Sequence, residues 1–313
     1  MASSTAPNVS GSPELWPALL LAEWEPTRAT LHMWMQIVGK ISLKLKPHVN
    51  HWWQTALHFN AHGLTTNAMC YRDRFVEIAF DLVNHQLLIR SGGKEKRMPL
   101  ITQSVADFYQ DIMSELRALG IDVSIWKMPV EIPDPIPFDQ DDIHRTYDRE
   151  YVSRFWRVLT TLQPIFGAFR ADFLGKCSPV HFFWGSFDIA VTRFSGRRAP
   201  EREGADSITR EAYSHEVISA GWWPGGGAVN DAAFYAYAAP EPIGYRTAKA
   251  RPEKAFYHRD LNEFILMYDD VRTAADPGQA LKNFLESTYE AGATLGRWDR
   301  ESLEAPRPIE KAG

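Results

Sequence analysis

The spacing of apolar residues predicts helices at four places along the chain. Apolar positions recur every three or four residues over 28–42, 104–120, 148–175 and from 276 onward, the period of a helix with one buried face. Ser104 precedes the second of these segments as an N-cap, and Gly120 ends it. Asp276-Pro277 opens the last, because proline is favoured at the first helical position.

Other segments alternate apolar and polar residues, which predicts antiparallel strands. These segments are 50–63, 74–101, 121–128, 181–194, 213–227 and 232–242. The order helix, strands, helix therefore occurs twice. We predict an α+β fold made of two related helix–antiparallel-strands–helix halves, packed as one pseudo-twofold body. Superposing 51–62 on 181–192 without a gap matches His51 to His181 and His58 to Asp188.

A proline-rich acidic stretch separates the two predicted halves. Four prolines fall within 129–142, where they exclude regular structure. We predict a disordered tail over 1–13, a first half over 14–128, a connector over 129–145, a second half over 146–304 and a tail over 305–313.

Charge and composition narrow the class of protein. A formal net charge of -5 gives no reason to expect nucleic acid or an anionic membrane as a partner. The 2 cysteines exclude a disulfide scaffold and a cysteine-rich metal site. The N-terminus lacks the basic and apolar parts of a signal peptide, and no apolar run is long enough to cross a bilayer. We expect a cytoplasmic protein with a small-molecule ligand; the sequence leaves its oligomeric state open.

Candidate chemistry is concentrated in the predicted strands. Alternation over 181–194 places Trp184, Ser186 and Asp188 on one face, and His181 with apolar residues on the other. Trp52 and His58 share a similar mixed face in the first half. Such polar groups among aromatic residues either line a pocket or satisfy one another inside a core, and both interpretations stay open.

The residue types suggest roles. Asp188, His58 and Glu216 are candidates for acid–base catalysis, and His181 with His215 for binding a divalent metal such as zinc or iron. No established metal-binding spacing supports the metal site. The candidates for substrate binding are Trp184, Ser186, Arg193, Trp52, Tyr235 and Tyr237, with Arg193 as the anchor.

Three classes of function follow. The leading hypothesis is an enzyme that acts on a small organic molecule, by metal-assisted or His/Asp acid–base chemistry in an aromatic-lined cavity. The alternative is a non-catalytic protein that binds or sequesters a small molecule. The third is a structural or interaction protein without a cavity, in which the polar groups bond to one another.

Several long phrases of the sequence resemble a bacterial family called domain of unknown function 5996. They include "GKCSPVHFFWGSFDIAVTRFSGRRAP", "EAYSHEVISAGWWPGG", "YDDVRTAADP", "LHMWMQIVGKI", "NHWW" and "MPVEIPDPIPFD". The resemblance runs from about Leu15 to about Trp298, and it implies a complete single-family protein. It implies no activity, substrate or cofactor.

Overall fold

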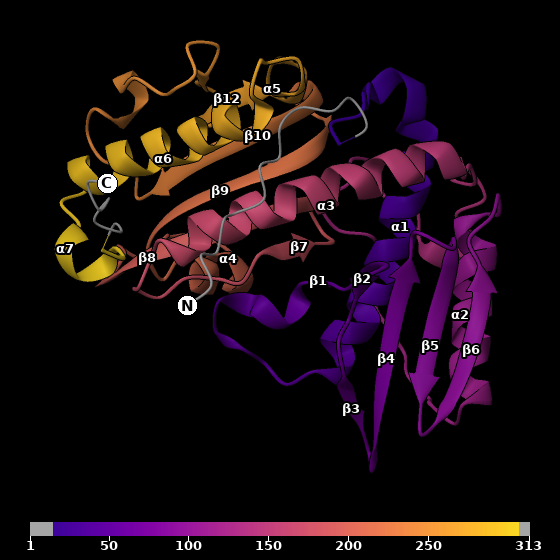
Figure 1. Cartoon of the computed structure of the whole chain (residues 1–313). Coiled ribbons are helices and arrows are strands. Elements are labelled where there is room, and N and C mark those ends of the chain that lie inside the picture. The colour runs from indigo at the N-terminus through magenta and orange to yellow at the C-terminus, as the bar shows by residue number, and fades with distance from the viewer. Residues whose placement is uncertain (1–14, 307–313) are drawn as a thin grey trace, which may run out of the picture.

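The protein has an α+β fold, as predicted. The computed structural model describes residues 15–306. The predicted tail over 1–13 and most of the tail over 305–313 therefore lie outside the described residues. Within 15–306, helices combine with two six-stranded antiparallel sheets (Figure 1).

The first half pairs two long helices with one of these sheets. Its elements are α1 (Leu21–Leu45), the 3-10 helix η1 (Asn50–Thr55), β1 (His58–Phe59), β2 (Gly63–Thr65), β3 (Met69–Tyr71), β4 (Arg74–Asp81), β5 (Gln86–Ser91), β6 (Lys94–Pro99) and α2 (Val105–Ala118). The strand order is β1-β2-β4-β5-β6, and β3 pairs with β4. Figure 1 shows α1 and α2 behind this sheet, where they pack against each other.

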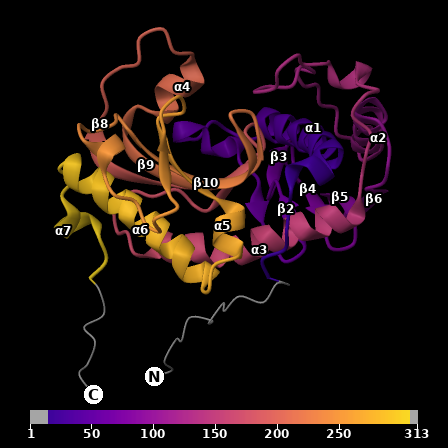
Figure 2. The same ribbon diagram turned by 90° about the horizontal axis from the view of Figure 1, so that it is seen from above.

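The second half follows a connector that is irregular except for one 3-10 turn at 138–140, so the prediction that the prolines exclude all regular structure there is wrong. The elements from the connector onward are η2 (Phe138–Gln140), α3 (Arg149–Ala171), β7 (His181–Phe183), β8 (Asp188–Arg198), α4 (Ser207–Ala212), β9 (His215–Gly226), β10 (Val229–Ala239), η3 (Tyr245–Thr247), β11 (Phe256–His258), β12 (Glu263–Met267), α5 (Tyr268–Arg272), α6 (Pro277–Leu295) and α7 (Arg300–Leu303). The strand order is β11-β12-β10-β9-β8-β7. Seen from above in Figure 2, α3, α5 and α6 lie on one side of this sheet and α4 on the other.

The two sheets meet at their edges. Leu57, next to β1, and Phe182 in β7 form an antiparallel bridge. Each backbone N–H of the pair donates to the carbonyl of the other residue, at 2.8 and 3.1 Å. Because both partners are completely buried, this bridge lies inside the core and fixes the first half against the second.

An aromatic cluster around Phe155 of α3 fills the junction. The Phe155 ring lies 5.3 Å from the ring of Phe187, 5.4 Å from Trp24 of α1, and 6.2 Å from both Phe182 and Trp222. These contacts join α1, β7, the turn before β8, and β9 through one buried side chain. The cluster therefore sets how the second sheet sits against α1.

The predicted helices are confirmed. α1, α2, α3 and α6 cover the segments with helical spacing, and α3 continues through Pro164. Ser104 caps α2 by accepting from the backbone N–H of Asp107, and Asp276 caps α6 in the same way.

Two predicted strands are wrong. Residues 50–55 form a 3-10 helix in which His51 and Trp52 have positive φ, so the predicted strand over 50–63 is reduced to the short β1 at His58–Phe59 and the first residue of β2. Residues 121–128 form no strand, because their backbone groups hydrogen-bond to α2 and η2 rather than to a neighbouring strand. Ile121 N–H donates to the last turn of α2, and the Lys127 carbonyl accepts from Phe138.

The segment 181–194 is two strands rather than one. Residues 184–187 form a tight turn between β7 and β8, with Phe187 at φ 60°. Across the turn Phe183 pairs with Asp188, and His181 with Ala190. His181 therefore shares the face of Asp188, and the predicted opposition between them is wrong.

The pseudo-twofold relation between the halves stays a prediction. The order helix, antiparallel sheet, helix does occur in each half. The gap-free superposition fails at its first residue, since His51 lies in a 3-10 helix and His181 in a strand.

Among the helices of residues 15–306, none is both long and apolar enough to cross a membrane.

Phe155→Ala should destabilise the whole molecule. Truncating a fully buried phenylalanine leaves a cavity and costs about 3–5 kcal/mol. Urea unfolding followed by tryptophan fluorescence would measure the loss. Phe75→Ala is the control, because Phe75 on β4 is 65% exposed and its loss should cost about 0.5 kcal/mol or less. Equal losses in the two variants would contradict the central role of the Phe155 cluster.

Candidate functional site

A pocket of about 640 Å³ lies over one face of the second sheet. We call it the main pocket. It is bounded by α1, the connector, the β7–β8 turn, the β9–β10 hairpin and the start of β12. Its lining side chains that bear charged, hydroxyl or aromatic groups are Arg28, His32, Glu131, Ser186, Asp188, Tyr213, Trp223, Tyr235, Tyr237 and Glu263.

The sheet register explains why one face is polar. Ala190 pairs with Gly221, Gly221 pairs with Tyr235, and Tyr235 pairs with Ile265. Paired residues in an antiparallel sheet share a face, as do residues two apart along a strand. Asp188, Tyr235, Tyr237 and Glu263 therefore lie on this face. The opposite face carries apolar residues of the main core, including Ile189, Val191, Ala220, Trp222, Phe234, Ala236, Phe264 and Leu266.

A hydrogen bond across β9 joins Tyr235 to Asp188. The Tyr235 hydroxyl on β10 donates to Asp188 Oδ2 on β8, so the side chain must pass over the strand between them. It passes at Gly221, where a Cβ atom would overlap the Tyr235 ring and hydroxyl. The missing side chain at Gly221 thus permits this bond.

Asp188 is a buried carboxyl group with an unused oxygen. Its residue is 5% exposed, and Oδ1 has no hydrogen-bond partner. Burial raises the pKa of Asp188 to about 7, the Tyr235 hydrogen bond opposes that rise, and the charge of Glu131 adds to it. Near neutral pH the group is thus divided between its protonated and ionised forms.

Glu263 has a second raised pKa in the same pocket. Burial, followed by repulsion from Asp188, raises the pKa of Glu263 to about 7. Like charges close together disfavour the state in which both are ionised. The two carboxyl groups therefore titrate as a coupled pair around neutral pH.

Hydroxyl groups continue from the carboxyl pair along the sheet. The Tyr213 and Tyr237 hydroxyls are 2.9 Å apart, and Ser219 Oγ lies 2.8 Å from Thr192 Oγ1. The rings of Tyr235 and Tyr237 stack with centroids 6.2 Å apart. These contacts hold the tyrosine side chains in place as one wall of the pocket.

α1 and the connector supply the opposite wall. His32 Nε2 lies 2.8 and 3.0 Å from the carbonyls of Gly185 and Trp184, so that nitrogen carries the proton. Burial and then the charge of Arg28 lower the pKa of His32 to about 4, which leaves the ring neutral. Ser186 Oγ donates to Glu131 at 2.8 Å.

Some of the predicted site residues do come together here. Asp188, Ser186, Tyr235 and Tyr237 all line the main pocket. Trp184, from the same turn, is buried instead against α1, where a Cβ on Gly39 would overlap its ring. Trp52 lies in η1 with its ring 4.9 Å from that of His48, away from the pocket lining.

The predicted histidines fall into separate pairs. His58 and His181 have ring centroids 5.4 Å apart, and burial lowers their pKa values to about 4 and about 3. His215 instead neighbours His51, at 5.7 Å. Within residues 15–306 no group of three or more His, Cys, Asp or Glu side chains is placed to hold a metal ion. The structure thus does not bring His181 and His215 together as joint ligands.

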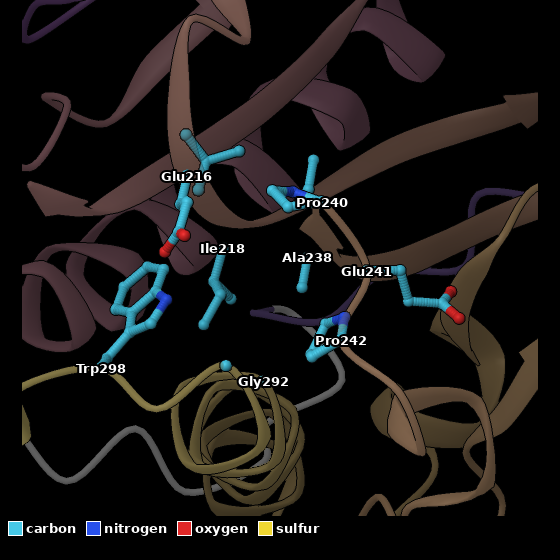
Figure 3. A pocket seen from close by; sticks show the side chains of 11 residues that line it. Glu216, Ile218, Ala238, Pro240, Glu241, Pro242, Gly292 and Trp298 are labelled. Carbon is cyan, nitrogen blue, oxygen red and sulfur yellow. The ribbon is translucent and has the colours of Figure 1, made fainter. Parts of the chain in front are cut away.

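Glu216 and Arg193 point away from the main pocket, because strand alternation puts them on the other face. Glu216 borders a smaller pocket of about 100 Å³ between β9, β10 and α6 (Figure 3). There it is paired with Arg197 at 2.6 Å. Arg193 is buried over the rings of Phe169 and Tyr289, at 3.6 and 4.2 Å. Neither side chain is therefore placed to act together with Asp188 in the main pocket.

Several residues that line the main pocket are not among those predicted from the sequence. Glu263 begins the short apolar run "EFILM", whose alternation places it with Ile265; that signal was available. Glu131 sits in a connector that carried no periodicity, and it has a positive φ of 57°. His32 and Arg28 occupy a helix in which a pocket-facing residue and a core residue look alike in sequence.

The assembled groups suit proton transfer. Two carboxyl groups with pKa values near neutrality border one open space, and tyrosine hydroxyls lie beside them. A carboxyl of this kind can accept or deliver a proton at neutral pH.

The carboxyl pair should make stability depend on pH. The folded chain holds protons on Asp188 and Glu263 up to about pH 7, whereas the unfolded chain loses them near pH 4. The free energy of unfolding should therefore fall as pH rises from about 4 to 7, and these groups should add no further change above that range.

Asp188→Asn tests this linkage. The variant should flatten that fall and be more stable than the wild type at pH 8, by on the order of 2 kcal/mol. Urea unfolding at pH 5 and pH 8 measures both values. Asp260→Asn, at an exposed position, should change neither. A large loss of stability in Asp188→Asn at pH 8 would instead show that the ionised carboxylate is structural.

Comparison with known proteins identifies a family without a described function. No curated protein and no solved structure matches the chain significantly. The model of a "Family of unknown function (DUF5996)" matches residues 16–305, nearly the whole chain. The resemblance noted in the sequence is therefore confirmed, and the protein belongs to the DUF5996 family.

Proposed function

We propose that the protein is an enzyme that acts on a small organic molecule by acid–base chemistry in the main pocket. One observation carries the proposal. Asp188, a buried residue whose Oδ1 has no hydrogen-bond partner, and Glu263 line the same pocket. A buried polar atom without a hydrogen-bond partner lowers the free energy of unfolding. Proteins keep such destabilising groups mainly at functional sites.

The proposed roles divide between the two carboxyl groups. Coupling between Asp188 and Glu263 favours the state in which one is ionised and the other is protonated. The ionised group would accept a proton from the substrate, and the protonated one would deliver a proton. Because Tyr235 donates to Asp188, its hydrogen bond favours ionisation there and makes Asp188 the base.

Binding without turnover is the second candidate. The tyrosine wall is held by its own hydroxyl contacts, and Trp223 packs against Tyr235 with ring centroids 5.5 Å apart. Preformed aromatic walls of this kind suit a sequestering protein equally well. An interaction protein without a cavity has less support, since the pocket is large enough for a small molecule.

Metabolite depletion can test the enzyme proposal. Purified protein is incubated with a small-molecule extract, and mass spectrometry follows each compound with time. We expect the wild type to consume at least one compound, and Asp188→Asn and Glu263→Gln to slow that consumption by about a hundredfold or more.

Matched controls separate chemistry from folding. Asp260→Asn and Glu253→Gln change exposed carboxylates outside the pocket and should retain the wild-type rate. A compound that is retained on the protein but not consumed would support sequestration. Consumption that is unaffected in folded Asp188→Asn and Glu263→Gln would overturn the assignment of the site.

A further inference from the structure

We propose that the ligand of the main pocket is an organic cation, an amine or ammonium group carried on an apolar or aromatic body. This inference rests on the proposed function for the location of the site and adds the class of ligand. It is drawn from the charges that line the pocket, one unsatisfied buried oxygen, and the aromatic walls.

The charges that line the pocket do not balance. Of the described lining residues, Glu131, Asp188 and Glu263 bear carboxyl groups, and none of them is in an ion pair with a lysine, arginine or histidine. Arg28 is the one arginine or lysine among those residues, and Glu25 already binds it with two hydrogen bonds of 2.6 and 2.7 Å. A cationic ligand would supply the missing positive charge.

The unsatisfied oxygen of Asp188 adds to the need for a hydrogen-bond donor at this carboxyl group. Asp188 is only 5% exposed, and its Oδ1 lacks any hydrogen-bond donor. Tyr235 occupies only Oδ2. An ammonium group has several N–H donors and no acceptor, so it could bind the Asp188 carboxyl group and still reach a second one.

The walls suit the same class of ligand. Tyr213, Trp223, Tyr235 and Tyr237 are among the residues that line the pocket. The face of an aromatic ring attracts cations, and cages of such rings recognise quaternary and alkylated ammonium groups. Arg202 already lies 3.9 Å from the centre of the Tyr213 ring, which shows that this ring accepts a cation on one face.

The other charged and titratable groups near the pocket do not supply the missing positive charge. His32 faces the pocket from α1 as a neutral ring, because burial lowers its pKa to about 4. Burial also holds the pKa of Tyr235 and of Tyr237 well above the ordinary range, so both hydroxyls stay neutral. Arg202 is outside the pocket lining.

Binding should release protons. Asp188 and Glu263 are each close to half protonated at pH 7 when no ligand is bound. A cation stabilises the ionised form of a neighbouring carboxyl group, so up to about one proton in total should leave at pH 7. Affinity should therefore rise by about tenfold or more between pH 5 and pH 8, while an alkylammonium probe keeps its charge.

Three probes of the same size and different charge test the proposal. Isothermal titration calorimetry compares phenethylamine, 2-phenylethanol and phenylacetate on the full chain. Titrations at pH 7 in two buffers of different ionisation enthalpy count the protons released. We expect the amine to bind at least about tenfold more tightly than the alcohol, and the acid to bind most weakly. Asp188→Asn and Glu263→Gln should each weaken amine binding by about tenfold or more, and Glu253→Gln should leave it unchanged.

Other outcomes would overturn the proposal. Equal binding of the alcohol, preference for the acid, or no amine binding at millimolar concentration would show that the pocket does not select a cation. Amine binding that survives in both carboxyl variants would place it elsewhere. Displacement of the amine by Ca²⁺ at the same concentration would point to an inorganic cation instead.

The two proposals can fail separately. If an uncharged or anionic metabolite is consumed in a manner that depends on Asp188, the enzyme proposal stands and the cation proposal falls. If the amine binds with proton release but no compound is consumed, the cation proposal stands and the protein is a sequestering one.

Discussion

The packing around Phe155 is the constraint on which the rest of the structure depends. This one ring contacts α1 through Trp24, the β7–β8 turn through Phe187 and the second sheet through Trp222. Interiors are packed densely enough that such a contact set has one arrangement. The turn is also held from α1 by His32, which donates to two of its carbonyls. The position of Asp188, the first residue after the turn, follows from these contacts.

The second sheet separates stability from chemistry by its two faces. The face against α3 and α6 is mostly apolar and contributes to the main core. The other face carries Asp188, Glu263 and the tyrosines, and it is only partly covered by α1 and the connector. Because alternation assigns every strand residue to one face or the other, Arg193 and Glu216 are excluded from the pocket by their position in the strand alone. The same geometry requires Gly221, since Tyr235 reaches Asp188 only by crossing the strand at that residue.

The carboxyl pair gives the pocket its chemical character. A buried carboxyl group without a cation partner either keeps its proton or destabilises the fold. Asp188 and Glu263 are such groups, and their raised pKa values show that burial favours the protonated form of each. Neutral His32 and the neutral tyrosines do not offset the negative charge that appears as the pair ionises. Proton transfer and recognition of a cation would both use this single feature, which is why the proposed function and the proposed ligand class rest on the same residues.

The sequence by itself determined the α+β class, the long helices with their caps, and most strands, because helix and strand periods are local properties of the chain. It also determined that Tyr235 and Tyr237 share a face, and that Asp188 belongs with the polar side of its strand. Only the tertiary structure decided that 184–187 is a turn, because the apolar run through it looks continuous in sequence while its backbone follows the packing of Phe187 and Trp184. Only the tertiary structure brought Glu263, Glu131 and His32 to Asp188, since each comes from a different segment and no pattern within a segment records which distant residue it will face. For the same reason, only the tertiary structure showed that His181 and His215 lie apart. Both histidines can bind a metal ion, but the residue type says nothing about the distance between the two side chains.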